Sequence, residues 1–140
     1  MAAKSAPFSM RLSKNMETLV ALEATRTGRS KGAIVEALAE EALRMRLFPG
    51  IAFRGTDWDR RAWVIGTALD VWQIVDAYRD LGSVQDMVDG GSVSERNVNL
   101  ALAYCERFPE EIDTAIADNH SSIDRLRAEF PFVAVTEIDA

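Results

Sequence analysis

Two pairs of acidic residues are the only candidates in this sequence for catalysis by paired carboxyl groups. Asp57 and Asp59 lie in a polar stretch, and Glu110 and Glu111 follow a proline. General acid–base catalysis needs such a group within hydrogen-bond reach of the proton that it moves. No nucleophile or base accompanies either pair, and a turn and a helix start explain the two placements. We therefore predict that the chain is not an enzyme, and no motif supports a small hydrolase.

The single cysteine, Cys105, and the single histidine, His120, limit the other chemistry that the chain supports. One cysteine excludes an internal disulfide and is typical of a reducing cytoplasm. Zinc sites need a cluster of cysteine and histidine ligands, so we expect no metal and no cofactor. No apolar run approaches the roughly 20 residues that cross a bilayer, and residues 1–4 lack the apolar core of a signal peptide. These features predict a cytoplasmic protein that does not associate with membranes.

A third candidate site is a short alternating segment near the N-terminus. Phe8, Met10 and Leu12 alternate with Ser9 and Arg11, so a β-strand here would place the apolar side chains on one face and the polar ones on the other. A strand this short cannot bury its apolar side alone. Two copies that pair antiparallel bury both apolar sides and gather the polar side chains on one exposed face. Because a two-stranded ribbon fits the major groove of B-DNA, the segment predicts a dimer that binds DNA.

The charge of the chain is distributed unevenly around a net value of −6. Residues 1–48 carry eight basic and five acidic residues, a net of +3, whereas the rest carries eight arginines and 17 acidic residues, a net of −9. A basic N-terminal part is attracted to phosphate, and an acidic remainder is repelled by it. The alternative is a soluble acidic protein whose N-terminal end is slightly basic.

The N-terminal part has the periodicity of two amphipathic helices, predicted over 14–27 and 31–47. Ser13 and Ser30 are suited to cap them, because a serine oxygen accepts a hydrogen bond from a free backbone N–H of the first turn. Gly28 suits the left-handed position that ends the first helix.

A proline–glycine break at 49–50 separates this first domain, 1–48, from a second domain, 49–119. Two apolar segments around a polar turn predict a β-hairpin over 51–65. From 70 onward the periodicity is helical, with breaks at glycines that favour several short helices. The expected helix starts are Asp70 and Ser94 as caps, Ser83 after Gly82, and Pro109 in the first turn of the last helix.

The order strand, helix, Gly-Arg-Ser turn and helix over residues 7–47 resembles the ribbon-helix-helix fold of Arc-like and CopG-like repressors and many bacterial antitoxins. The resemblance implies a dimer that binds a palindromic operator. It also implies roles for individual residues. Pro7, Ser9 and Arg11 would face the major groove, Ser30 and Lys31 would bind a phosphate at the helix start, and Phe8, Met10 and Leu12 would pack inside the dimer.

Four further segments occur in order at 49–54, 65–75, 101–104 and 109–113. Together they resemble a small helical domain of unknown function that is common in bacterial toxin–antitoxin-like operons, often beside a gene for a PIN-like nuclease. That family has a winged or homeodomain-like helix-turn-helix core, which implies an antitoxin or regulatory role. The helix-turn-helix candidate, 83–107, has nearly balanced charge. We therefore favour a scaffold for self-association or toxin binding over a second DNA site.

The C-terminal segment 120–140 is apolar for a chain end, because it carries Phe130 and Phe132 together with two valines. Disorder is the default for a terminus. The alternative is an extended segment that becomes ordered on a partner. If the partner is a nuclease with a carboxylate metal site, Arg125 or Arg127 would pair with those carboxylates.

Together these features predict a mainly α-helical protein with a ribbon-helix-helix part and a helix-turn-helix-like part. We interpret it as a bacterial antitoxin, a dimer or higher oligomer that binds operator DNA and neutralises a cognate toxin, with a PIN-like nuclease as one candidate. The alternative is a free-standing ribbon-helix-helix repressor whose second domain senses a ligand or only oligomerises. The residues expected to contact the toxin are Trp58, Arg125, Arg127, Phe130 and Phe132.

Overall fold

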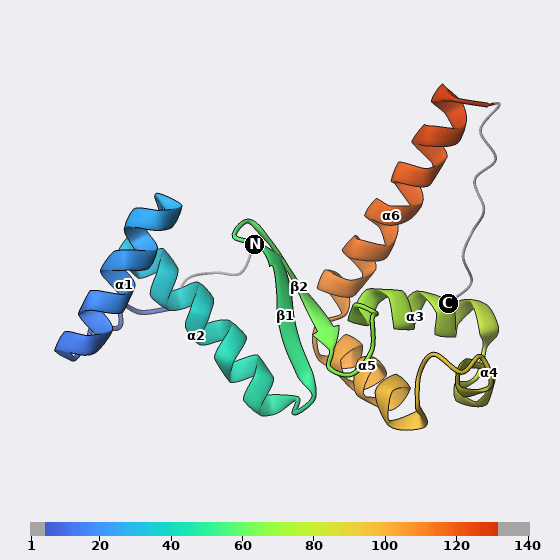
Figure 1. Cartoon of the computed structure of the whole chain (residues 1–140), viewed down its shortest axis with the longest axis horizontal. Helices are drawn as coiled ribbons and strands as arrows, with labels where there is room; N and C mark the ends of the chain where they lie inside the picture. The colour runs from blue at the N-terminus through green and yellow to red at the C-terminus, as the bar shows by residue number, and fades with distance from the viewer. Residues whose placement is uncertain (1–4, 132–140) are drawn as a thin grey trace. The chain divides into compact units, whose positions relative to one another are not determined.

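The computed structural model describes residues 5–131, which are mainly helical and contain one β-hairpin (Figure 1). The chain divides into two compact units between Ala42 and Leu43. This division falls within the second helix, earlier than the boundary expected after residue 48. The elements are α1 (Lys14–Thr27), α2 (Lys31–Leu47), β1 (Ile51–Thr56), β2 (Asp59–Val64), α3 (Val71–Leu81), α4 (Val84–Asp89), α5 (Glu95–Arg107) and α6 (Pro109–Glu129).

The first unit contains α1 and most of α2, and both helices begin and end where the sequence predicts. The hydroxyl oxygen of Ser13 accepts a hydrogen bond from the backbone N–H of Met16 at 3.2 Å. Ser30 caps α2 in the same way, through the N–H of Ala33 at 3.2 Å. Gly28 ends α1 in the left-handed conformation, with φ of 71°. The predicted caps are therefore confirmed.

Segment 8–12 forms neither helix nor strand in the single chain. A lone strand has no partner for its backbone N–H and C=O groups, and the predicted ribbon supplies that partner from a second copy. The strand therefore stays a prediction that concerns the dimer.

The second unit begins with the predicted hairpin, in which β1 and β2 pair antiparallel. Ile51 lies opposite Val64 at one end, and Thr56 lies opposite Asp59 at the tip. Gly55 has φ of 122°, and a Cβ atom at this position would overlap the carbonyl oxygen of Asp59. Only glycine fits here, because it has no Cβ and adopts positive φ without strain.

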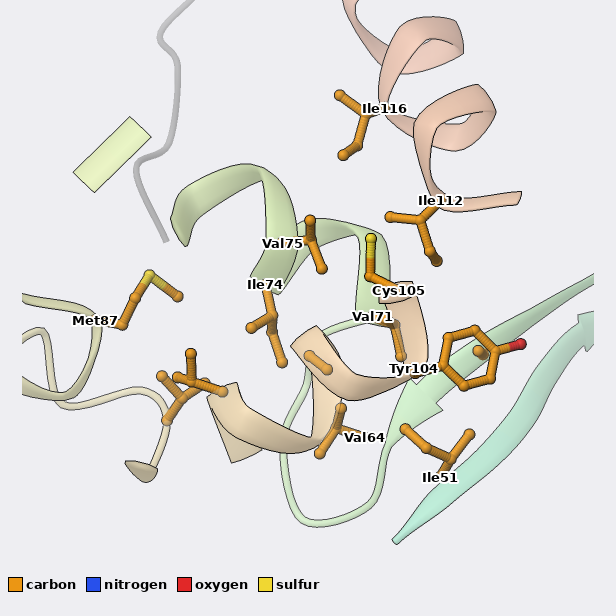
Figure 2. Close-up of a cluster of buried hydrophobic side chains, with 14 residues drawn as sticks. Ile51, Val64, Val71, Ile74, Val75, Met87, Tyr104, Cys105, Ile112 and Ile116 are labelled. Carbon is orange, nitrogen blue, oxygen red and sulfur yellow. The ribbon is translucent and has the colours of Figure 1, made fainter. Parts of the chain in front are cut away.

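One cluster of buried apolar side chains joins the hairpin to the four following helices (Figure 2). Val71 and Ile74 of α3 and Val98 of α5 are fully buried at its centre. Burying each such side chain contributes about 1.5–3 kcal/mol relative to exposure. Trp72 of α3 is partly buried against the cluster.

The helices of the second unit begin at the caps that the sequence predicts. Asp70, Ser83 and Ser94 are the N-caps of α3, α4 and α5, and Pro109 occupies the first turn of α6. α4 and α5 follow each other across a short turn, as in a helix-turn-helix. Likeness to a particular helix-turn-helix family stays a prediction.

α6 continues to Glu129 and not to about residue 119, so residues 120–129 are helical in place of the extended or disordered segment expected from residue 120. No glycine or proline interrupts 110–130, and the final turns consist largely of arginine, leucine and alanine, which are strong helix formers. Pro131 ends the helix because the residue before a proline avoids the helical conformation. Phe132 and the rest of 132–140 lie outside the described residues.

Candidate functional site

The residues predicted for the dimer interface are exposed in the single chain. Phe8 is 86% exposed and Met10 is 61% exposed, while Leu12 is half-buried. Among residues 5–42, only Val20 and Ile34 are buried. Exposed leucines also lie on α1 and α2. A helix pair that buries so little of its apolar surface gains little stability from it.

The residues predicted to read DNA share the same segment and are also exposed. Pro7, Ser9 and Arg11 all lie at the surface of the first unit. Serine and arginine side chains in this position have the donors that base edges and phosphates accept. The structure places these side chains in one short segment, but only a second copy would form the ribbon face.

The start of α2 is arranged as an anion site would require. Ser30 caps the helix and Lys31 is exposed, and no acidic residue lies in the first turn. Space is open beside Gly32, where a Cβ atom would meet no other atom within 4 Å. Free backbone N–H groups and the helix dipole favour an anion at such a position.

Two arginines in the basic N-terminal part are engaged within their own unit. Arg26 forms an ion pair with Glu23 of the same helix at 2.7 Å. Arg44 donates to the hydroxyl of Tyr104 and to a carboxylate oxygen of Glu111, each at 2.8 Å. Arg44 therefore stabilises the second unit, and its charge does not belong to a DNA-binding surface.

The Arg44 contact is part of a polar network that sequence reasoning did not reveal. The Tyr104 hydroxyl donates to Glu111 at 2.6 Å, and the Arg44 guanidinium lies 3.9 Å from the ring centre of Phe108. Phe48 packs edge-on against Tyr104 with ring centres 5.4 Å apart. This network gives Glu111, a carboxylate candidate, a structural role. No local signal could have indicated its link to Arg44, because Arg44 lies 60 residues from Tyr104 in the sequence.

The network also alters the acidity of Tyr104. Burial raises the pKa of the Tyr104 hydroxyl, and its hydrogen bond to Glu111 raises the pKa further, while Arg44 partly opposes this. The neutral phenol is therefore the form that the fold favours. Burial likewise raises the pKa of the Cys105 thiol. The thiolate, which is the nucleophilic form, is therefore disfavoured at this site.

Replacing Tyr104 with phenylalanine tests this network through its pH dependence. At pH 8 we expect Tyr104→Phe to lose about 1 kcal/mol of unfolding free energy, because one hydrogen-bonding hydroxyl is removed. Above about pH 10 the unfolded tyrosine loses its proton while the folded one keeps it, so ionisation of this residue lowers the stability of the natural chain and has no counterpart in the variant. Urea unfolding of the two proteins at pH 8 and pH 11 measures the lost hydrogen bond and the pH-dependent loss of stability. If the two proteins differ in unfolding free energy by the same amount at pH 8 and pH 11, the raised pKa of Tyr104 is wrong.

The hairpin carries the other carboxylate candidates and the exposed tryptophan. Trp58 is 73% exposed at the tip, as the prediction of a contact residue requires. Asp59 forms an exposed ion pair with Arg61 at 3.4 Å. The buried carboxylate of Asp70 forms ion pairs with Arg54 at 2.8 Å and with Arg61 at 3.2 Å. The sequence indicated Asp70 only as a helix cap, so its role in holding both arginines was missed.

The remaining predicted contact residues lie at the outer end of α6. Arg125 and Arg127 occupy its last turns, and Phe130 directly follows it with 42% of its surface exposed. Trp58 belongs to the hairpin, and nothing places it beside this end of α6. The structure thus shows a helical surface where the sequence suggested an extended segment.

Residues 5–131 contain no group of three or more His, Cys, Asp or Glu side chains that could hold a metal ion. None of the helices there is long and apolar enough to cross a membrane. A surface hollow of 740 Å³ is wide open, unlike pockets that enclose small ligands. It is lined by Pro49, Ser94, Glu95, Arg96, Asn99 and Leu100.

No protein-family model, no curated protein and no solved structure matches this chain. The functional interpretation therefore depends on the residues themselves.

Proposed function

We propose that the chain is a bacterial antitoxin that binds operator DNA as a dimer through its N-terminal unit and neutralises a protein toxin through its acidic second unit. The observation that carries the DNA-binding part is the exposed apolar side of segment 8–12. Phe8 and Met10 stand exposed beside Ser9 and Arg11, in a unit with two buried residues among those described. Pairing with a second copy covers the apolar side and doubles the polar face.

The start of α2 supports the same proposal from an independent direction. Its capped, acid-free first turn with Lys31 is suited to hold a backbone phosphate. Phosphate contacts fix the position of a protein on DNA, while the ribbon side chains read the bases.

The antitoxin part of the proposal is supported by the second unit. It is folded around its own core, carries most of the acidic residues, and presents apolar side chains on the outer turns of α6. Such a unit is suited to bind a basic protein and is repelled by DNA. The open hollow beside Pro49 gives no support to a ligand-sensing repressor.

Arg11→Ala is the variant that tests DNA binding. We expect it to lower affinity for the promoter DNA of its own gene by about tenfold or more, because a bidentate arginine–guanine contact contributes about 1–3 kcal/mol. Gel shifts with the full chain at a fixed salt concentration measure the effect. Arg26→Ala is the matched control, since it removes the same charge from an ion pair on α1. Equal DNA binding by the Arg11→Ala protein and the natural chain would show that the ribbon does not read the bases.

A further inference from the structure

Arg60 lies on β2, but its side chain binds the backbone of β1. The guanidinium donates hydrogen bonds to the carbonyl oxygen of Phe53 at 3.2 Å and to that of Gly55 at 3.3 Å. Arg60 lies directly opposite Gly55 in the register of the two strands. Because glycine has no side chain, it leaves the space that the Arg60 side chain needs to cross β1. Gly55 thus permits this contact as well as the turn.

Both carbonyl oxygens belong to the edge of β1 that faces away from β2. In an antiparallel pair, the backbone groups of opposite residues point alternately toward the other strand and away from it. At the pair Ile51 and Val64 they point away, because both N–H groups donate to carbonyl oxygens outside the ladder. By the same alternation, the N–H and C=O groups of Phe53 and Gly55 also point away from β2. We call this side of β1 its outer edge.

The outer edge has no strand beside it in the described part of the chain. β1 and β2 form a two-stranded sheet, so β1 pairs on one side alone (Figure 1). An unpaired edge offers its N–H and C=O groups to any strand that reaches it, and a second copy of the chain has an identical edge. Folded proteins commonly protect such edges with charged side chains. Here a guanidinium already occupies two of the edge carbonyls.

We propose that Arg60 blocks the outer edge of β1 against pairing with the same edge of a second copy. Two such edges in antiparallel pairing would exchange hydrogen bonds between their Phe53 residues, with each N–H donating to the carbonyl of the other. The Arg60 guanidinium occupies that carbonyl and would also meet the same charge on the second copy. The inference does not depend on the antitoxin function. In a dimer with two hairpins, edge pairing would join dimers into open chains.

Arg60→Ala is the variant that tests this block. It uncovers both carbonyl oxygens, so we expect the full-length variant to associate beyond the oligomer of the natural chain about tenfold more tightly. Sedimentation velocity over a range of protein concentrations measures the association. Arg96→Ala is the matched control, because it removes the same charge from an exposed position on α5. It should sediment like the natural chain.

Amide hydrogen exchange shows where the association takes place. A strand that pairs with the outer edge accepts hydrogen bonds from the N–H groups of Phe53 and Gly55. In the Arg60→Ala protein, exchange at these two amides should therefore slow as the protein concentration rises, whereas in the natural chain it should not change. Arg60→Ala protein that sediments like the natural chain overturns the inference. Association without slower exchange at these amides overturns it as well.

Arg60→Lys separates the carbonyl contacts from the charge. Lysine keeps the positive charge but lacks the fork of donors that reaches two oxygens. We expect this variant to associate more than the natural chain and less than the Arg60→Ala protein. If it sediments like the natural chain while the Arg60→Ala protein associates, repulsion between charges is sufficient to block the edge, and the role of the carbonyl contacts is overturned.

Discussion

The full chain carrying Met10→Asp is expected to sediment as a monomer under conditions in which the natural chain sediments as a dimer. In the proposed ribbon, Met10 of each copy lies on the apolar side that the partner covers. An unpaired carboxylate buried there costs several kcal/mol, and the symmetry of the dimer buries two of them. Because each 1.4 kcal/mol is a factor of ten, the dissociation constant should rise by about a thousandfold or more. Operator binding should fall with it, since one copy has only half of the ribbon.

Ser9→Asp is the control for this result. It places the same charge one residue earlier, on the polar side of the alternating segment, which stays exposed in the dimer. We expect Ser9→Asp to remain a dimer while it loses affinity for DNA through repulsion from phosphate. A dimer of undiminished stability in the Met10→Asp protein would show that the segment does not form the interface. Monomers in both variants would show that the alternation does not define two sides.

Helix limits were predictable from the sequence because they depend on neighbouring residues. Ser13 and Ser94 lie one residue before α1 and α5 and cap them, and Gly28 ends α1 with positive φ. Each of these effects operates within one turn of helix, so a single sequence contains the necessary information. The β-hairpin was predictable from the sequence for the same reason.

The end of α6 was not predictable from apolar periodicity alone. Four polar residues, 119–122, interrupt the apolar stripe, and this interruption suggested that the helix stops. Polar residues on an exposed helix face do not break it, whereas proline does. The helix therefore continues to the residues just before Pro131. The absence of proline and glycine from 110–130 therefore indicates the length of α6 better than apolar periodicity does.

Contacts between distant residues account for what the sequence did not reveal in the candidate sites. Arg44 counts as a basic residue of the N-terminal part, yet it binds Tyr104 and Glu111 in the second unit. Charge totals treat every arginine as available to a partner. Only the fold shows which of them a carboxylate of the same chain already holds.

Asp70 is a buried carboxylate of the second unit whose loss should lower stability markedly. Its buried carboxylate receives Arg54 from β1 and Arg61 from β2. These two arginines lie directly opposite each other across the hairpin. Like charges in that position repel, and Asp70 is the anion that both of them contact. It also begins α3, so one side chain ties the hairpin to the first helix of the core.

Asp70→Ala is therefore expected to lower the unfolding free energy by about 2–4 kcal/mol. Removing one member of a buried ion pair typically costs about 3–5 kcal/mol, and we discount this because both arginines are partly exposed and can turn toward water. Asp59→Ala is a matched control, since Asp59 also contacts Arg61 but is exposed. It should cost less than about 1 kcal/mol. Urea unfolding followed by tryptophan fluorescence compares the two variants, with the slope m showing whether the unfolded surface stays the same. If the two aspartates prove equally dispensable, the hairpin is held by its apolar contacts with α3 and α5, and the two arginines need no shared anion.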